Sequence, residues 1–393
     1  MSVRLAIAII VIAELFGTSL WFSINAVADA LTREWGISVA ELGHLTSAVQ
    51  IGFIAGTLVI ALSGIADRFS ASRIFAATAL LGALANAALV WMAEGFASAL
   101  AFRLVTGVAL AGIYPLGMKL VVSWAPERAG NVLGWLVGML VVGSGVPHLV
   151  RGLALTPDWQ GVIYASSLLA VLGALMVGWL GDGPHHGSAR RLHWGGVLQS
   201  FRLSRFRAAA FGYFGHMWEL YAYYALAPLL VAPYLAGASP QTVYLATAGA
   251  FTAGGIGCVV GGLLSHRVGS ARVAMVALAG SAACCLVFPL AQGWATPLVL
   301  GLLWAWGALV VTDSPQFSAL AAGALPPERM GGALAFMNSI GFGITVVAIE
   351  LAALQWESLG PRIGWLLLPG PLFGLLAMAP LWRERGRAAL ARG

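Results

Sequence analysis

Twelve stretches of this chain, each about 20 residues or longer, are almost free of charged side chains. A helix of that length crosses the roughly 30 Å of hydrocarbon in a bilayer, where only helices and closed barrels satisfy the backbone. The alternation expected of barrel strands is absent, so we predict an all-α membrane protein with twelve transmembrane helices. The stretches are 4–30, 41–66, 73–93, 97–124, 130–153, 160–181, 207–235, 241–264, 272–292, 295–324, 330–354 and 360–382.

The composition and the placement of basic residues agree with this prediction. Of 393 residues, 60% are hydrophobic and 9% are charged, against about 25% charged in soluble domains. If the chain starts in the cytoplasm, sixteen arginines lie on that side and only Arg33, Arg151 and Arg362 on the other. We therefore predict a multi-pass protein of a bacterial inner membrane with both termini cytoplasmic. The net charge of +6 follows from this topology and gives no reason to expect a nucleic-acid partner.

Two pairs of loops repeat at about half the chain length. Residues 63–73 are matched by 262–272, and residues 126–130 are matched by 327–331. Repeats at this spacing indicate a duplicated membrane unit, which is the layout of many secondary transporters. We predict two pseudo-symmetric six-helix bundles at 1–181 and 207–393, the second with a short basic cytoplasmic tail, joined by a basic cytoplasmic linker at 182–206.

The cysteines and histidines do not indicate a metal or a cofactor. Cys258, Cys284 and Cys285 fall within predicted helices without paired spacing, so we interpret them as small packing residues. In the linker, His185, His186 and His193 have no cysteine or carboxylate beside them to complete a metal site. We predict that the protein holds neither a metal ion nor a cofactor.

The first of the repeated loops resembles a signature of the major facilitator superfamily, usually written G-x-x-x-D-R-x-G-R-R. Asp67 and Arg68 are intact, whereas Ser63 and Ser70 stand where glycines are usual, and the second copy has His266 in place of the aspartate. The likeness extends over essentially the whole chain. It implies the twelve-helix fold of that superfamily and movement of a small solute, through a monomer, by alternating access.

The loop residues are candidates for a cytoplasmic latch between the two bundles. Asp67 and Arg68 at a helix end are placed to bind a neighbouring helix terminus and the facing loop. Positive-inside charge alone accounts for the arginines but leaves Asp67 unexplained. The latch candidates are Asp67, Arg68, Arg73, Lys119, Glu127, Arg128, Arg267, Arg272, Glu328 and Arg329.

Arg103 and Gly107 resemble the R-x-x-x-G signature of proton-coupled members. A cation within a membrane helix costs at least about 2.5–3.5 kcal/mol unless it is paired or solvated, which favours a function for Arg103. Arg103 also lies near the end of its helix, where its side chain can extend to the interface instead. The Gly-Pro pair of many antiporters and the buried arginines of nitrate carriers are absent, so no subfamily is assigned.

Polar side chains share single faces of two predicted helices. The residues Tyr213, His216, Glu219 and Tyr223 follow a spacing of 3, 3 and 4, and Glu14, Thr18, Trp21 and Asn25 follow 4, 3 and 4. The resemblance implies that helices 1, 4, 7 and 10 line a central cavity. The proton-coupling candidates are Glu14, Arg103, Glu219 and Asp313. The substrate-cavity candidates are Trp21, Asn25, Tyr213, His216, Tyr223, Trp306, Gln316 and Asn338. A structural hydrogen bond between His216 and Glu219 is the alternative for that pair.

These observations favour a proton-coupled transporter of a small organic solute, with the solute and protons as its partners in the bilayer. Uptake of a small anion, attracted by Arg103, Lys119 and His216, is an alternative. A membrane assembly factor or receptor without transport is another, although buried carboxyls are costly in a purely structural bundle. An enzyme is not expected, because no metal-binding or nucleophile-base pattern occurs at helical spacing.

Overall fold

The computed structural model describes residues 1–156, 158–185 and 198–390; the side chains at 67, 128–131, 327–329, 331 and 383–390 also lie outside the description. The described residues are helical and contain no strand. The first half consists of α1 Val3–Thr18, η1 Asn25–Val27, α2 Ala28–Trp35, α3 Val39–Ser63, α4 Ile65–Arg68, α5 Ala71–Met92, α6 Phe96–Trp124, η2 Pro126–Arg128, α7 Ala129–Gly152 and α8 Trp159–Leu180.

The second half repeats this pattern of long helices with short interruptions. It consists of α10 Ser204–Val231, η3 Ala232–Leu235, α11 Pro240–Val268, α12 Ser270–Val287, η4 Phe288–Leu290, α13 Thr296–Thr312, α14 Ser314–Gly323, α15 Pro327–Leu354, α16 Trp356–Leu359, η5 Gly360–Arg362, α17 Ile363–Leu367 and α18 Pro369–Leu390. The predicted linker at 182–206 includes 186–197, outside the description, and its boundaries stay a prediction.

Twelve crossing segments follow the predicted stretches to within a few residues, and the predicted fold class is confirmed. Within the described ranges, ten helices are long and apolar enough to cross a bilayer by themselves. The first crossing is shared between α1 and α2 because the helix breaks after Thr18, and the seventh, α10, carries ionisable residues such as His216 and Glu219.

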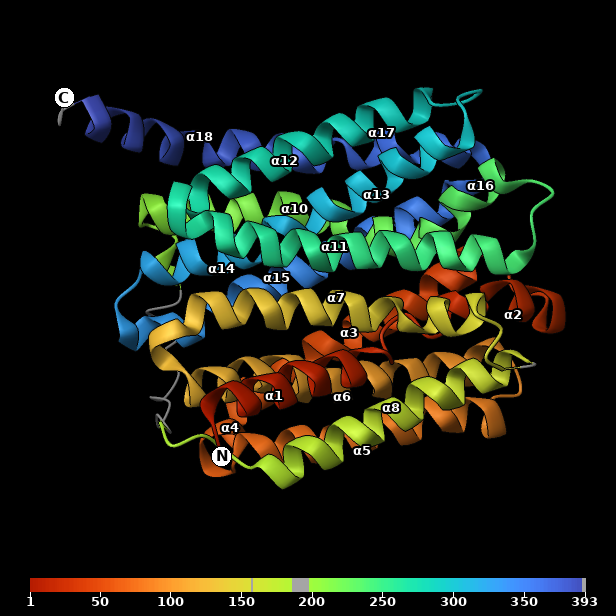
Figure 1. Cartoon of the computed structure of the whole chain (residues 1–393), viewed down its shortest axis with the longest axis horizontal. Helices are drawn as coiled ribbons and strands as arrows, with labels where there is room; N and C mark the ends of the chain where they lie inside the picture. The colour runs from red at the N-terminus through yellow and green to blue at the C-terminus, as the bar shows by residue number, and fades with distance from the viewer. Residues whose placement is uncertain (157, 186–197, 391–393) are drawn as a thin grey trace.

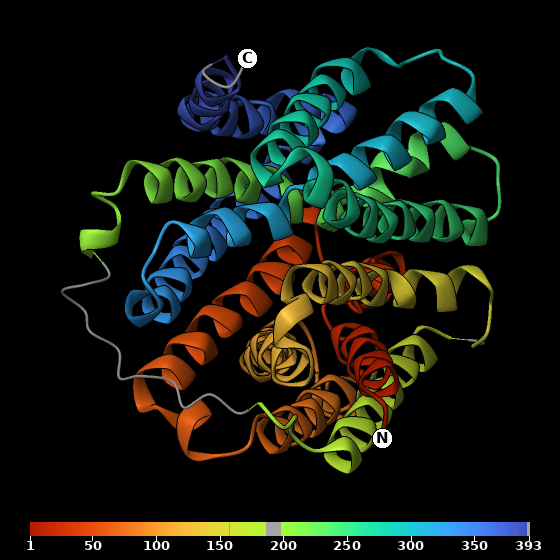
Figure 2. The same ribbon diagram turned by 60° about the vertical axis from the view of Figure 1, so that its left-hand side comes forward.

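The two halves lie side by side, as Figures 1 and 2 show, with α1 to α8 on one side and α10 to α18 on the other. They meet where α7 packs along α11 and α3 packs along α15. The start of α1 and the end of α18 lie at one end of the molecule, which we call the termini end; α2 and α16 lie at the opposite end, the α2 end (Figure 1).

Glycines allow α7 and α11 to pack closely. A Cβ atom built on Gly138 would lie 2.9 Å from the carbonyl oxygen of Gly255, and one built on Gly255 would lie 2.4 Å from Cγ2 of Val142. Both distances are shorter than side-chain carbons tolerate, so these positions require glycine at the present separation. Small residues of this kind are the usual means by which membrane helices approach each other.

The first and the tenth crossings are each interrupted by a break in the helix. In the first, the Ser23 hydroxyl donates to the carbonyl of Leu20 at 3.1 Å, within the turn between α1 and η1. In the tenth, α13 ends and α14 begins around Asp313, with Pro315 in the first turn of α14. Proline lacks a backbone N–H, so the interruption at Asp313 follows from the sequence. Both breaks border the candidate functional site.

Candidate functional site

A cavity lies at the centre of the molecule between the two halves. Its walls come from the turn between α1 and η1 and from α6, α7, α10, α11, α13, α14 and α15, and no charged residue is among the described residues that line it. The space open to the centre of a water molecule is about 40 Å³, which holds a few waters but no organic solute. The lining residues are Phe22, Tyr114, Val137, Leu140, Val141, Ser144, Tyr213, Met217, Leu220, Tyr221, Tyr224, Phe251, Val311, Ser314 and Phe342.

Aromatic rings form much of this lining and stack on one another across the two halves. Tyr224 of α10 stacks on Phe251 of α11 with ring centroids 4.3 Å apart. Tyr221 stacks on Phe22 of the first half at 6.2 Å. Stacked aromatic faces and two serine hydroxyls form a surface suited to a flat, largely apolar molecule with a few polar atoms.

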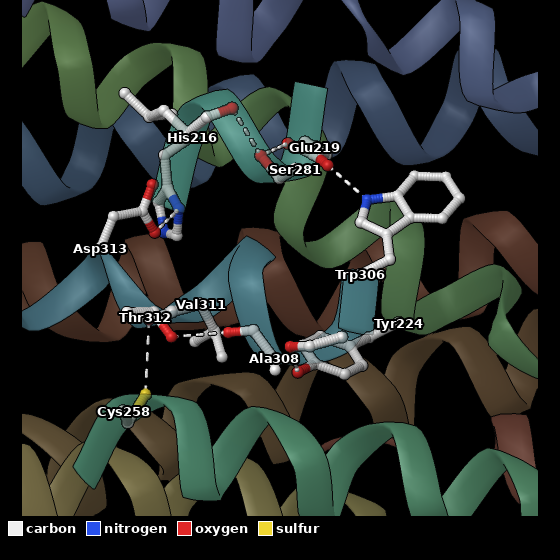
Figure 3. Close-up of polar contacts among 12 residues, drawn as sticks. His216, Glu219, Tyr224, Cys258, Ser281, Trp306, Ala308, Val311, Thr312 and Asp313 are labelled. Carbon is white, nitrogen blue, oxygen red and sulfur yellow. Dashed lines mark hydrogen bonds and ion pairs between the residues drawn. The ribbon is translucent and has the colours of Figure 1, made fainter. Parts of the chain in front are cut away.

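A histidine and an aspartate lie in contact with each other next to the cavity wall, where both are buried. Nδ1 of His216 on α10 lies 2.8 Å from Oδ1 of Asp313 at the break between α13 and α14, and both side chains are 1% exposed (Figure 3). Each lies beside a lining residue. The ring of His216 packs against that of Tyr213, with ring centroids 5.8 Å apart, and Asp313 directly precedes Ser314. Nε2 of His216 has no hydrogen-bond partner within the described part of the chain.

Glu219 points away from the cavity, into the packing of the second half. Its carboxylate accepts from the hydroxyl of Ser281 at 3.0 Å and from the indole N–H of Trp306 at 2.5 Å (Figure 3). It also accepts from the thiol of Cys285 at 3.2 Å. Ser281 and Cys285 are one turn apart on α12, and Trp306 lies on α13. Glu219 therefore joins α10 to α12 and α13. The alternative hydrogen bond between His216 and Glu219 does not occur among the described contacts, because His216 contacts Asp313 instead.

Arg103 of α6 is fully buried and does not extend to the interface. Its guanidinium donates to the carbonyl of Trp21 at 2.6 Å and to the carbonyl of Leu20 at 3.2 Å, both freed by the break after α1. It also donates to Ser23 and to Asn86 of α5. Arg103 thus satisfies the backbone of the broken helix, and none of the partners named here is a carboxylate.

Glu14 of α1 is completely buried, and neither carboxyl oxygen has a hydrogen-bond partner among the described residues. A Cβ atom built on Gly117 of α6 would lie 2.3 Å from Oε2 of Glu14, so the absence of a side chain at Gly117 leaves room for the carboxyl. A buried carboxyl without a partner is costly as an anion, which makes Glu14 a second candidate for binding a proton.

The other predicted cavity residues divide by position. Tyr213 lines the central cavity. Trp21 is not among the lining residues, and its ring packs against that of the lining residue Tyr221, with ring centroids 5.5 Å apart. Tyr223 is turned the other way and donates to the carbonyl of Leu303 at 2.7 Å. Asn25 lines a different cavity at the α2 end. Trp306, Gln316 and Asn338 are not among the lining residues, and Gln316 is buried on α14 whereas Asn338 is half-buried on α15.

The predicted latch residues lie at the termini end. Lys119 of α6 donates to the carbonyl of Ala66 in α4, and Asp182 accepts from the backbone N–H of Ser72 at 2.7 Å, at the start of α5. Both contacts lie within the first half. Several candidates are exposed, namely Arg68, Arg73, Glu127, Arg267 and Arg272. The side chains of Asp67, Arg128, Glu328 and Arg329 lie outside the description, so the latch stays a prediction.

The sequence of this chain matches one protein family along most of its length. Residues 7–349 match the sequence profile of the Major Facilitator Superfamily. The chain belongs to the major facilitator superfamily. The predicted resemblance is confirmed, and the family consists of membrane transporters rather than enzymes.

The chain is also similar in sequence to individual members of the superfamily. The chain is 35% identical over 133 residues to the niacin transporter NiaP of Acinetobacter baylyi, covering 31% of this chain and 29% of NiaP. It is 28% identical over 157 residues to the 4-hydroxybenzoate transporter PcaK of Pseudomonas aeruginosa, covering 38% of this chain and 34% of PcaK. The chain therefore matches about a third of the length of these two curated relatives.

The fold is similar to that of a solved superfamily structure. The xylose transporter XylE of Escherichia coli, in a partially occluded inward open conformation, superimposes with a TM-score of 0.75 at 12% identity, covering 97% of each chain. At this identity the likeness concerns the fold. It confirms the arrangement of two helical halves for this member of the superfamily.

Sequence reasoning missed most of the cavity lining in this superfamily member, because it followed polar residues. The α7 residues Val137, Leu140, Val141 and Ser144 line the cavity with the spacing of one helix face, but in a membrane helix an apolar face indicates nothing by itself. Ser281 and Cys285 were missed as partners of Glu219. Their i, i+4 spacing was visible, whereas their position beside α10 was not.

Proposed function

We propose that the chain is a proton-coupled secondary transporter of a small aromatic solute in a bacterial inner membrane, acting as a monomer with both termini in the cytoplasm. The observation that carries the proposal is the buried His216–Asp313 pair beside an aromatic cavity that contains no charged lining residue. A titratable pair in this position is able to exchange a proton when the cavity opens to water.

The solute class is supported by the chemistry of the cavity. Rings of Tyr221, Tyr224 and Phe251 offer stacking faces, and the hydroxyls of Ser144 and Ser314 offer a few hydrogen bonds. The two relatives carry niacin and 4-hydroxybenzoate, which are both single-ring aromatic acids. We infer that this chain also carries a one-ring solute.

Binding of a free anion is less favoured by the same observations. The described lining of the cavity carries no arginine or lysine, and Arg103 is engaged by the carbonyls of Leu20 and Trp21. An aromatic acid would then enter the apolar cavity in its neutral, protonated form, and the coupled proton would be bound separately by the His216–Asp313 pair. Proton coupling and a neutral aromatic cavity are thus two parts of one mechanism.

The central cavity must expand during transport, because its present volume excludes an organic solute. The His216–Asp313 pair joins α10 to the α13–α14 break, which is an interrupted helix next to the wall. Protonation of Asp313 would weaken the ion pair and allow α14 to move relative to α10. Cavity opening and proton binding would thereby be linked.

The proposal is tested in proteoliposomes that contain a pH-sensitive dye and the full chain. Nicotinate, nicotinamide, 4-hydroxybenzoate and xylose are added outside, and proton entry is followed. We expect proton entry driven by the aromatic compounds at a rate above that in protein-free liposomes, and unchanged in a Glu94→Gln control, whose side chain lies on an exposed loop. Absence of proton entry for every compound, from folded protein, would favour uniport or a role without transport.

A further inference from the structure

A second, larger cavity opens at the α2 end of the molecule. The space open to the centre of a water molecule is about 560 Å³, against about 40 Å³ for the central cavity. Its walls come from α2 and α3 of the first half and from α10, α11 and α15 of the second half. A volume of this size is within the range of small-molecule sites, which is about 300–1,000 Å³.

The wall of this cavity is mostly apolar, and the one carboxylate among its described lining residues, Asp29, is paired with arginine. Leu229 of α10 and Val243 of α11 are typical of the lining. Asp29 lies 3.0 Å from the guanidinium of Arg33 and 3.6 Å from that of Arg151, and it accepts from the hydroxyl of Tyr244 across the two halves. Because the charges on the wall pair with one another, the cavity suits an uncharged solute with an apolar body.

A partition that includes residues of the break after α1 lies between this cavity and the central one. Its first layer is Asn25, whose side-chain amide donates to Thr46 at 3.0 Å and to the carbonyl of Ala225 in the second half at 3.4 Å. Its second layer is Phe22, three residues earlier, whose ring lies against Tyr221 and Phe251 of the central cavity. Among the described residues, a hydrogen bond of 3.4 Å and these ring contacts join the halves at this point, and they must separate for a solute to pass between the two cavities.

We propose that the cavity at the α2 end is a second binding site, which holds an uncharged one-ring solute in transit to or from the central cavity. This inference rests on the proposed function, because the occupant is the transported solute. The evidence for that occupant is continuity: Asn25 lines the larger cavity, Phe22 lines the central one, and both belong to the break between α1 and α2. The site lies on the solute path and is distinct from the central cavity.

The test counts bound molecules of nicotinamide, a neutral one-ring probe, on the full chain in lipid nanodiscs. We expect two per chain in the wild type. The variant with both Leu229→Trp and Val243→Trp, which fills the larger cavity, should bind one. Ser144→Trp, which fills the central cavity, should also bind one, because it loses the nicotinamide molecule of the central cavity. Leu354→Trp is the matched control, because it places the same ring on an exposed face of α15, and it should bind two.

A second measurement does not depend on tolerance of bulky residues. Leu229→Cys is labelled with a thiol reagent; the three native cysteines are buried. With nicotinamide at about ten times its Kd, labelling should slow about tenfold, because only the empty site reacts. Labelling of Glu94→Cys on the exposed loop should not change.

The outcomes separate this inference from the proposed function. One molecule per chain, lost in Ser144→Trp and kept in the double tryptophan variant, with Leu229→Cys unprotected, overturns the second site and leaves transport intact. Two molecules per chain without solute-driven proton entry would support the site and contradict the proposed coupling. No binding of nicotinamide contradicts the second site as stated.

Discussion

Nδ1 of His216 lies 2.8 Å from Oδ1 of Asp313, and this contact joins α10 to the interruption between α13 and α14. Both residues are buried. His216 lies one helical turn from Tyr213, Asp313 directly precedes Ser314, and Tyr213 and Ser314 both line the central cavity. An ion pair at a helix break is placed to change both its protonation and its geometry. The proposed coupling depends on this pair, whereas Glu219 and Arg103 have structural partners of their own.

Asp313→Asn should separate coupling from solute movement. The amide keeps the shape of the carboxyl but binds no proton, so a pH gradient of one unit should no longer drive the roughly tenfold accumulation that it supports in a coupled carrier. Exchange of labelled for unlabelled nicotinamide should continue, since it needs no net proton movement. Both are measured by tracer uptake in proteoliposomes. Loss of exchange together with accumulation would instead indicate a structural role for Asp313.

Glu219→Gln should lower stability. The amide has one acceptor oxygen for the donors Ser281, Cys285 and Trp306, and hydrogen bonds to a charged group contribute about 1.5–3 kcal/mol each. We expect a lower midpoint of thermal unfolding in detergent, followed by tryptophan fluorescence. Trp306→Phe removes only one donor and should have a smaller effect. Unchanged stability with complete loss of proton coupling would return Glu219 to the set of coupling residues.

Arg103→Met should destabilise the first half, because the carbonyls of Leu20 and Trp21 lose their donor inside the bundle. Each unsatisfied buried group costs about 1–3 kcal/mol. Arg103→Lys should recover part of this loss, since an ammonium group provides donors without the planar fork. Thermal unfolding of the three proteins ranks them. If Arg103→Lys folds as well as the wild type but loses proton coupling, the resemblance to proton-coupled members describes Arg103 better than the structural role does.

Tyr221→Leu should weaken binding of an aromatic solute. Aromatic pairs contribute about 0.5–1.5 kcal/mol beyond buried area, so the Kd should rise about 2- to 10-fold. Tyr223→Phe is the matched control on the same helix, because its hydroxyl donates to Leu303 and its ring faces Trp306 rather than the cavity. Equal effects of the two substitutions on the Kd of nicotinamide would mean that Tyr221 does not contact the solute.

Gly255→Ala should separate α7 from α11. Its Cβ would lie 2.4 Å from Val142, and such overpacking typically costs about 1–3 kcal/mol. Gly301→Ala is the comparison: no atom lies within 4 Å of its built Cβ, and alanine favours a helix by about 1 kcal/mol over glycine. We expect a lower unfolding midpoint for Gly255→Ala and an equal or higher one for Gly301→Ala. The reverse order would show that the α7–α11 contact adapts easily.

The fold was largely predictable from the sequence. The length of each membrane helix could be predicted from the length of its apolar stretch. Pro315 indicated the break before α14. The break after Thr18 has no proline or glycine within 19–24, so its signal was only the group of polar side chains that includes Ser19, Ser23 and Asn25. Arg103 on a distant helix stabilises that break, and such a contact is not visible in a linear pattern.

The candidate site was predicted only in part. Glu14, Glu219, His216 and Asp313 are all buried, as their positions in apolar stretches indicated. Their partners were not predicted, because a helical spacing gives the face of one helix but not the neighbour that it meets. For example, Tyr213 and Tyr223 both lie on the predicted stripe of α10, yet Tyr213 lines the cavity and Tyr223 faces α13.

The most direct test of proton coupling is the pH gradient at which net solute movement stops. Nicotinamide is used because a neutral compound is not concentrated by trapping of its ionised form, and the membrane potential is clamped at zero. With one proton per solute, a tenfold solute gradient should be balanced by an opposing pH gradient of about one unit, since both correspond to about 1.4 kcal/mol. Net movement that stops only at equal solute concentrations, whatever the pH gradient, would contradict the account.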